Sequence, residues 1–201
     1  MLCLLGALVA TPTRAQVGLG GGLDFNRLDA IDAANASATF ERSTGYHLGV
    51  FFDAELGALS IRPGIFYHDV GQYEFRDLEG GVDPEETVTI DLSAVEFPID
   101  VRFRLFPDAT ATPYLLAAPV FTFPRSEDDF DGTRNFNLTA DVGVGFEIEV
   151  AEMGLALLPE FRYGIGTTSF LEDSFEVAGT TVEPQDDPQL DAIMLRLNIR
   201  F

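Results

Sequence analysis

Two histidines are the residues of this 201-residue chain best suited to acid–base chemistry, because imidazole changes its charge near neutral pH. His47 and His68 both lie on the polar parity of segments in which polar and apolar residues alternate. A catalytic nucleophile needs a base beside it and a third group that orients the base. No such set stands out around either histidine, so we predict no catalytic residues and a chain that is not an enzyme.

Thiol and metal chemistry have little support in the sequence. Cys3 is the only cysteine, and it lies in a segment that we expect to be removed, which leaves no disulfide and no Cys-ligated metal. Glu127, Asp129 and Asp131 are similar to the start of a calcium loop, but Leu138 stands where the twelfth-position Glu is needed. We predict a solvated acidic loop, no metal site and no cofactor, while loose binding of divalent cations stays open.

Charged residues in the alternating segments share one parity, and their two signs nearly balance. They could line a selective or gated pore, or they could fill the interior of a barrel as ion pairs. We favour ion pairs, because an unpaired buried charge is costly. The predicted lumen ion-pair network consists of Arg62, Glu96, Asp100, Arg102, Arg104, Asp141, Glu147, Glu160, Arg162, Arg196 and Arg200.

Eight segments position these charges, and in each of them apolar residues recur at every second position. This period predicts β-strands, which we place within 17–25, 46–52, 59–67, 88–105, 114–120, 138–148, 155–165 and 193–201. The apolar parity carries no charge in any of them. It also carries four tyrosines that fit an interfacial aromatic girdle, namely Tyr46, Tyr67, Tyr114 and Tyr163.

Two of the segments need a more detailed prediction. In the fourth, Val88, Ile90 and Leu92 are apolar at even positions, but the apolar residues from Phe97 onward are odd; the parity slips near Ser93-Ala94, which predicts a β-bulge there. In the fifth, we assign the residues Tyr114, Leu116, Ala118 and Val120 to the apolar face. The bulky residues expected to face inward and to pack the interior are Phe66, Leu115, Phe121 and Leu158.

The connections between these segments alternate in length. Short links are expected at 55–57, 106–111 and 151–154, and long ones at 26–43, 71–86, 124–134 and 171–188. This layout is typical of barrels that cross a bacterial outer membrane, with short turns on the periplasmic side and long loops outside. We predict an all-β fold, a monomeric eight-stranded antiparallel up-and-down transmembrane β-barrel with a packed lumen.

The N-terminal segment predicts export. Leu2 to Ala10 form an apolar core too short to span a bilayer, Pro12 interrupts it, and Thr13-Arg14-Ala15 resembles a signal-peptidase site. The segment departs from the usual pattern because it has no basic residues before the apolar core. We expect a signal peptide at 1–15, cleavage before Gln16, and a barrel at 16–201 that is exported through the periplasm.

The charge balance excludes one class of partner. The chain has 33 acidic residues against 12 basic ones, all of them Arg, for a net charge of -21. Binding to nucleic-acid phosphates needs basic patches, so nucleic acid is not an expected partner. Most of the acidic residues fall in the four long connections, which predicts acidic extracellular loops.

Alternation alone does not say which face is buried, and a soluble lipocalin-like barrel with an apolar interior is the other possibility. Three features favour the inverted arrangement. The apolar runs are long enough for tilted spanning strands, the polar face mixes Gly with Arg and carboxylates, and the last strand ends on an aromatic residue. That ending, with Leu197, Ile199 and Phe201 on one face, resembles the signal that the barrel assembly machinery recognises.

Several short motifs resemble the outer-membrane β-barrel domain family that includes PorT-like proteins, related in architecture to the small OmpX and OmpA barrels. They are Arg62-Pro63-Gly64, Val95-Glu96-Phe97-Pro98, Pro113-Tyr114-Leu115 and Gly143-Val144-Gly145-Phe146. The family often has Gly where this chain has Ala118. The resemblance implies the fold and an outer-membrane location, and it implies little about activity.

These observations predict a structural or interaction role, with outer-membrane lipid and lipopolysaccharide as partners of the wall and the loops. A narrow, porin-like solute or ion pore is the alternative. A lipid-modifying enzyme is less favoured, because its histidine should face lipid, and His47 and His68 do not have that parity.

Overall fold

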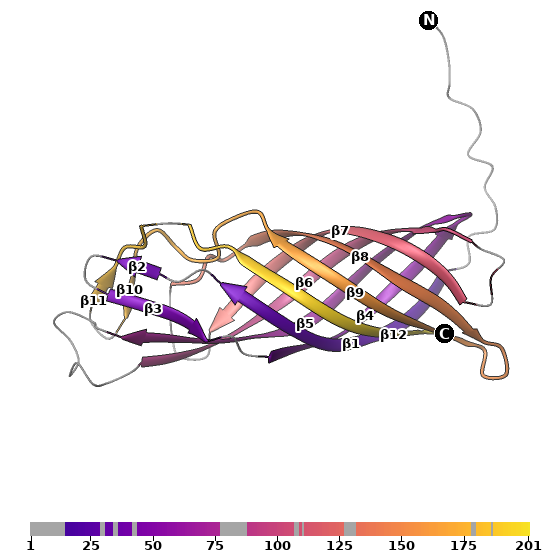
Figure 1. Ribbon diagram of the computed structural model, residues 1–201, viewed down its shortest axis with the longest axis horizontal. Coiled ribbons are helices and arrows are strands. Elements are labelled where there is room, and N and C mark those ends of the chain that lie inside the picture. The colour runs from indigo at the N-terminus through magenta and orange to yellow at the C-terminus, as the bar shows by residue number, and fades with distance from the viewer. Residues whose placement is uncertain are drawn as a thin grey trace, which may run out of the picture.

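The computed structural model describes residues 15–28, 31–33, 36–41, 44–76, 88–106, 109, 111–126, 132–177, 180–185 and 187–201. Eight long strands form a closed antiparallel barrel, and each pairs with its neighbours around the ring (Figure 1). They are β1 (Ala15–Leu28), β4 (Thr44–Leu56), β5 (Leu59–Arg76), β6 (Val88–Arg104), β7 (Ala111–Ser126), β8 (Asn137–Val150), β9 (Leu155–Gly166) and β12 (Leu190–Arg200). The predicted eight-stranded up-and-down barrel is confirmed.

Four short strands lie at one end of the barrel, which we call the long-loop end. They are β2 (Ile31–Ala33), β3 (Ala36–Glu41), β10 (Phe175–Val177) and β11 (Thr180–Val182). β3 pairs with the part of β5 that extends beyond β4, from Gln72 to Arg76. β5 therefore continues five residues past Gly71, where we expected a loop to begin. Within the described residues, no helix is long and apolar enough to cross a membrane.

The opposite end carries tight turns, and we call it the short-turn end. Gly57 and Gly154 have φ values of 68° and 64° in the turns that join β4 to β5 and β8 to β9. Side chains rarely adopt this left-handed backbone, so glycine suits both positions. The C-terminus lies at this end (Figure 1), where the Phe201 amide donates to the Val17 carbonyl at 2.9 Å.

The polarity of the barrel is inverted relative to a water-soluble protein. Apolar side chains such as Leu48 and Leu197 are 63% and 49% exposed on the outside, whereas Arg162 and Asn198 are fully buried inside. The predicted outward parity agrees with the structure in β1, β4, β8, β9, β12 and the part of β5 up to Tyr67. Tyr46, Tyr67 and Tyr163 are among the outward side chains, as expected.

The parity predicted for β7 is wrong. The four residues expected outside, Tyr114, Leu116, Ala118 and Val120, are buried inside. Leu115 is 48% exposed, and it pairs with the outward residues Phe103 and Val144 on the two neighbouring strands. Phe121, also expected inside, is half-buried and stacks on Phe136. Because β7 is apolar on both parities, alternation could not choose its face, and the register with β6 and β8 decided it. Phe66 and Leu158 are buried as predicted.

The bulge predicted at Ser93-Ala94 is also wrong. β6 alternates without a break, and the register shift lies on its partner strand, between Asp69 and Gly71 of β5. Gly71, beside this bulge, has a φ of 119°, a backbone conformation that glycine tolerates and other residues rarely adopt. Ile90 and Leu92 are buried inside, not outside. The apparent slip in β6 arises because its interior side chains change from charged to apolar toward the long-loop end.

Candidate functional site

The lumen is the candidate site, and the small residues of β1 make room for its large side chains. A Cβ added at Gly20 would lie 2.9 Å from the Phe66 ring, and one at Gly22 would lie 2.8 Å from the His47 ring. Both rings are nearly fully buried, and the Arg196 guanidinium lies 4.3 Å from the centre of the Phe66 ring. Glycine on one strand thus lets bulky residues of the neighbouring strands fill an eight-stranded interior.

A four-membered cluster of charges occupies the middle of the lumen. Arg162 donates to both oxygens of Asp100, at 3.0 and 2.6 Å, and to Glu160 at 2.8 Å. Arg62 donates to Asp100 at 2.8 Å and also pairs with Glu160. Tyr114 adds a hydroxyl that donates to Glu160 at 2.7 Å. Two guanidiniums therefore neutralise two carboxylates through planar, charge-assisted contacts.

A second cluster lies at the short-turn end. Arg200 reaches four carboxylates, with Glu147 at 2.6 Å, Glu55 at 2.8 Å, Glu149 at 3.0 Å and Asp53 at 3.3 Å. Asp53 also pairs with Arg102. These contacts connect β4, β6, β8 and β12 across the interior, so the cluster holds distant strands together.

A third cluster contains both histidines and lies nearer the long-loop end. His47 donates from Nδ1 to Asp24 at 2.7 Å, and its Nε2 accepts from Arg196 Nε at 2.8 Å. His68 bonds Glu96 through Nδ1 at 2.7 Å, and its Nε2 lies 3.4 Å from Asp24. Among the described residues, no hydroxyl nucleophile is hydrogen-bonded to either ring. Both rings therefore link charged groups of the lumen.

The lumen ends in an apolar cluster at the long-loop end. Its side chains come from the far parts of β5 and β6, the β10–β11 hairpin and the segments beside it, and they are nearly or fully buried. The cluster consists of Val70, Phe75, Ile90, Leu92, Ala94, Phe170, Leu171, Phe175, Val177, Val182 and Leu190. We call it the outer cap. Below it, a cavity of about 20 Å³ lined by His68, Glu96 and Asp141 has room for about one water molecule.

The residues predicted as one network lie in these separate clusters. Arg62, Asp100, Glu160 and Arg162 meet in the middle, and Asp141 lies 3.5 Å from Arg162. The short-turn cluster contains Arg102, Glu147 and Arg200, together with Arg104, which lies 3.4 Å from Glu55. Glu96 and Arg196 lie beside the histidines. Leu197 and Phe201 face outward, and Ile199 is half-buried on the same face.

No protein-family model matches the chain, and no curated protein matches its sequence. Solved structures do match. The outer membrane protein OprG from Pseudomonas aeruginosa is 12% identical, with a TM-score of 0.58 over 94% of this chain and 97% of that one. Neisserial surface protein A is 13% identical, with a TM-score of 0.53 over 92% of this chain and 95% of that one. This chain has the fold of the small outer-membrane barrels.

Sequence reasoning missed several residues of this small barrel's lumen. Asp24 and Asp53 are fully buried and take part in the clusters, although the predicted network left them out. Both stand on the inward parity of their strands, so the alternation itself could have found them. Tyr114 had no such signal, because β7 is apolar on both faces.

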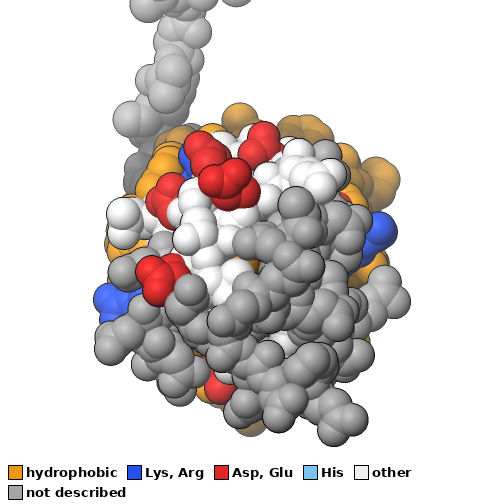
Figure 2. All heavy atoms as spheres, turned by 90° about the vertical axis from the view of Figure 1, so that its left-hand side faces the viewer, with side chains coloured by type: hydrophobic (Ala, Val, Ile, Leu, Met, Phe, Trp, Pro, Cys, Tyr) orange, Lys and Arg blue, Asp and Glu red, His pale blue; other side chains and the backbone are white. Residues whose placement is uncertain are grey.

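Two further predictions concern metal and loops. Within the described ranges, no group of three or more His, Cys, Asp or Glu side chains is arranged to hold a metal ion. Glu127, Asp129 and Asp131 lie outside the described residues, as does the predicted signal segment up to Arg14. Figure 2 looks onto the long-loop end of the barrel, where several acidic side chains lie exposed in the upper part of the view and hydrophobic side chains show at the edge behind them.

Proposed function

We propose that this protein is a bacterial outer-membrane barrel with a packed, non-conducting lumen, and that it has a structural or interaction role. Its long loops would face the exterior, where they meet solutes, lipopolysaccharide or a partner protein. One observation carries the proposal. At the same height along β5 and β6, the outward side chains change from apolar to polar and the inward side chains change from charged to apolar.

The outer face gives the first half of this observation. Near the middle of the barrel, the outward residues of β5 and β6 are apolar, with Ile65 and Ile99 43% and 39% exposed. Toward the long-loop end they become polar, with Gln72, Thr89 and Asp91 exposed. A charged residue that faces lipid at mid-depth costs about 2–4 kcal/mol. The change supports a boundary between lipid and water at this level.

The inner face changes in the opposite sense at the same level. The inward residues Arg62, Glu96 and Asp100 give way to Val70 and Leu92. An apolar interior is stable when its surroundings are water, and a charged interior is tolerated when the surroundings are lipid and the charges are paired. Both faces therefore support a barrel that spans a bilayer and a cap that lies in water.

The packing of the lumen supports a closed barrel over a pore. Ion-paired clusters occupy its length, the outer cap covers its long-loop end, and the cavity between them has space for about one water molecule. Eight strands enclose a space that side chains can fill. Narrow, porin-like conduction is the alternative that this packing disfavours.

Two measurements test the proposal. An SDS gel of the outer-membrane fraction, boiled beside unboiled, should show a heat-dependent change in mobility, and a soluble protein without this change would overturn the membrane location. In planar bilayers, the folded protein should give no steady current steps. Reproducible current steps would contradict the closed barrel and support the pore.

Maturation and the absence of enzymatic activity belong to the same proposal. We expect the mature chain to begin at Gln16 after removal of a signal peptide at 1–15, which N-terminal sequencing of the membrane-extracted protein checks. We also expect lipids incubated with the protein to remain unmodified in mass spectrometry, since His47 and His68 both point into the lumen.

A further inference from the structure

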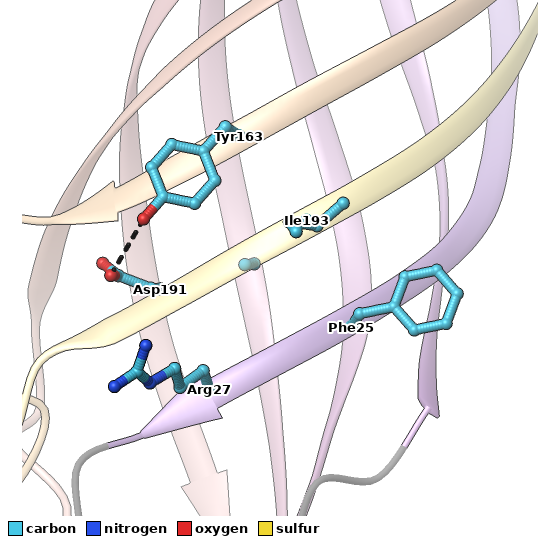
Figure 3. Close-up of a pocket in the computed structure, with 6 residues that line it drawn as sticks. Phe25, Arg27, Tyr163, Asp191 and Ile193 are labelled. Carbon is cyan, nitrogen blue, oxygen red and sulfur yellow. Dashed lines mark hydrogen bonds between the residues drawn. The ribbon is translucent and has the colours of Figure 1, made fainter.

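A pocket of about 420 Å³ lies on the outside of the barrel wall, where β1, β12 and β9 approach the long-loop end. Phe25 and Ile193 form its apolar part and are 41% and 42% exposed. Arg27, Asp191 and the Tyr163 hydroxyl form its polar part (Figure 3). The pocket therefore has an apolar side and a charged side, as an amphiphile does.

The height of the polar part follows from strand geometry. Arg27 comes ten residues after Val17 on β1. With a rise of about 3.3 Å per residue and a tilt of about 40°, this separation is about 25 Å along the barrel axis, which is the height of the apolar band of a membrane barrel. Arg27 and Asp191 thus stand at the level of the lipid headgroups, above the acyl chains.

The two charges of the pocket are held side by side without an ion pair between them. Arg27 and Asp191 are register partners on adjacent strands. Asp191 accepts from the Tyr163 hydroxyl at 3.1 Å and from the Gly166 amide at 3.1 Å, and Figure 3 shows its carboxylate turned toward Tyr163. Within the described part of the chain, no carboxylate lies within 4 Å of the Arg27 guanidinium. A carboxylate has about four lone-pair sites, so Asp191 retains acceptor capacity.

We propose that this pocket binds the headgroup of a zwitterionic lipid that carries a phosphate and a primary ammonium, such as phosphoethanolamine. Arg27 donates to the phosphate, for which a guanidinium is well shaped. Asp191 accepts from the ammonium, and an acyl chain packs along Phe25 and Ile193. A zwitterion fits better than an anion, because Asp191 cancels the charge of Arg27 and the chain carries a net charge of -21, which repels anionic headgroups.

A second pocket, on another part of the barrel wall, provides the contrast. It is lined by Tyr46, Tyr67, Asp69 and Asp91 at the long-loop ends of β4, β5 and β6. It has the tyrosines and the carboxylates but no arginine among its lining residues. The cation beside the carboxylate is what distinguishes the β1–β12–β9 pocket and makes it suitable for a phosphate.

The chain has no tryptophan, so one introduced on the pocket floor reports on the lipid beside it. Ile193→Trp protein is placed in phosphatidylcholine bilayers that contain dibrominated phosphatidylethanolamine, dibrominated phosphatidylglycerol or dibrominated phosphatidylcholine, and quenching is compared. We expect the ethanolamine lipid to be enriched about fivefold over the choline lipid at this position, the size of roughly one interfacial charge contact. Equal quenching by the three lipids, or stronger quenching by the glycerol lipid, would overturn the assignment.

Further substitutions in the Ile193→Trp protein separate the roles of the two charged residues. Arg27→Gln and Asp191→Asn should each reduce the enrichment to near one. Arg125→Gln removes the same charge from an exposed site at the long-loop end of β7 and should leave the enrichment unchanged. Loss of the preference in the Arg125→Gln control, or its persistence without Arg27, would contradict the proposal.

The inference rests on the proposed membrane location, and the experiment distinguishes the two. If the protein does not span a bilayer, no brominated lipid quenches the introduced tryptophan and the gel shift is absent. If all three lipids quench equally and the gel shift is present, the membrane barrel is supported and only the proposed headgroup site is wrong.

Discussion

The middle of the barrel and the outer cap are built from the same two strands, yet they follow opposite packing rules. In the middle, β5 and β6 bury Arg62 and Asp100 and expose Ile65. In the cap, they bury Phe75 and Leu92. The two strands pair with each other in both regions, with a register shift between Asp69 and Gly71. The difference teaches that alternation fixes only that two faces exist, and that the medium outside the wall decides which of them must be apolar.

The two regions should also differ in how their stability responds to substitution. A buried ion pair is stable only while each charge keeps its partner, because both have been removed from water. An apolar cluster loses stability in proportion to the contacts and the area that are removed. The four predictions below test this difference, beginning with the largest expected effect.

Arg162→Met should destabilise the barrel most. It leaves Asp100 and Glu160 short of a partner in the centre of the lumen, and breaking a buried pair in this way costs about 3–5 kcal/mol. Urea unfolding of the reconstituted protein measures the change. Arg104→Met is the control, since its side chain at the short-turn end is 17% exposed and its removal should cost clearly less. Equal losses in the two variants would contradict the role of the central cluster.

Ile99→Arg should cost about 2–4 kcal/mol, because it places a charge on the outward face near mid-depth of a membrane. Gln72→Arg makes a similar change on the outward face of β5 above the polarity reversal and should cost close to nothing. The same unfolding measurement in lipid vesicles compares them. Similar effects at both positions would place the boundary elsewhere and weaken the membrane proposal.

Leu92→Ala should cost about 2–3 kcal/mol, at the low end for a buried leucine, because we expect a cap in water to relax around the cavity. Hydrogen exchange should quicken in β10 and β11, which pack on the same cluster, and stay slow in β8 and β9. Uniform acceleration around the whole barrel would mean that the cap and the barrel unfold as one unit.

Asp173→Asn should have the smallest effect, about 0.5 kcal/mol or less. Its carboxylate pairs with Arg134 at 2.6 Å, but the Asp173 side chain is 85% exposed, and exposed ion pairs contribute little. The comparison with Arg162→Met tests whether the burial of an ion pair determines how much it contributes to the free energy of unfolding. A loss above 2 kcal/mol would contradict this.

Some of the site could be predicted, and some could not, for identifiable reasons. The inward position of Arg62, Glu160 and Arg162 follows from their parity, and Asp24 could have been found in the same way. The apolar stretch of β6 around Leu92 was misassigned because we took apolar side chains to face outward along the whole strand, which holds only where lipid surrounds it.

The sequence by itself determined the eight barrel strands and the existence of two faces on each, because a period of two is a local property that each strand carries alone. Only the tertiary structure decided which carboxylate meets which guanidinium, which face β7 turns inward, and that the β10–β11 hairpin joins the cap over the lumen. These depend on the tilt and register with which eight strands close into a ring, so partners such as Arg62 and Glu160, 98 residues apart, meet only after closure.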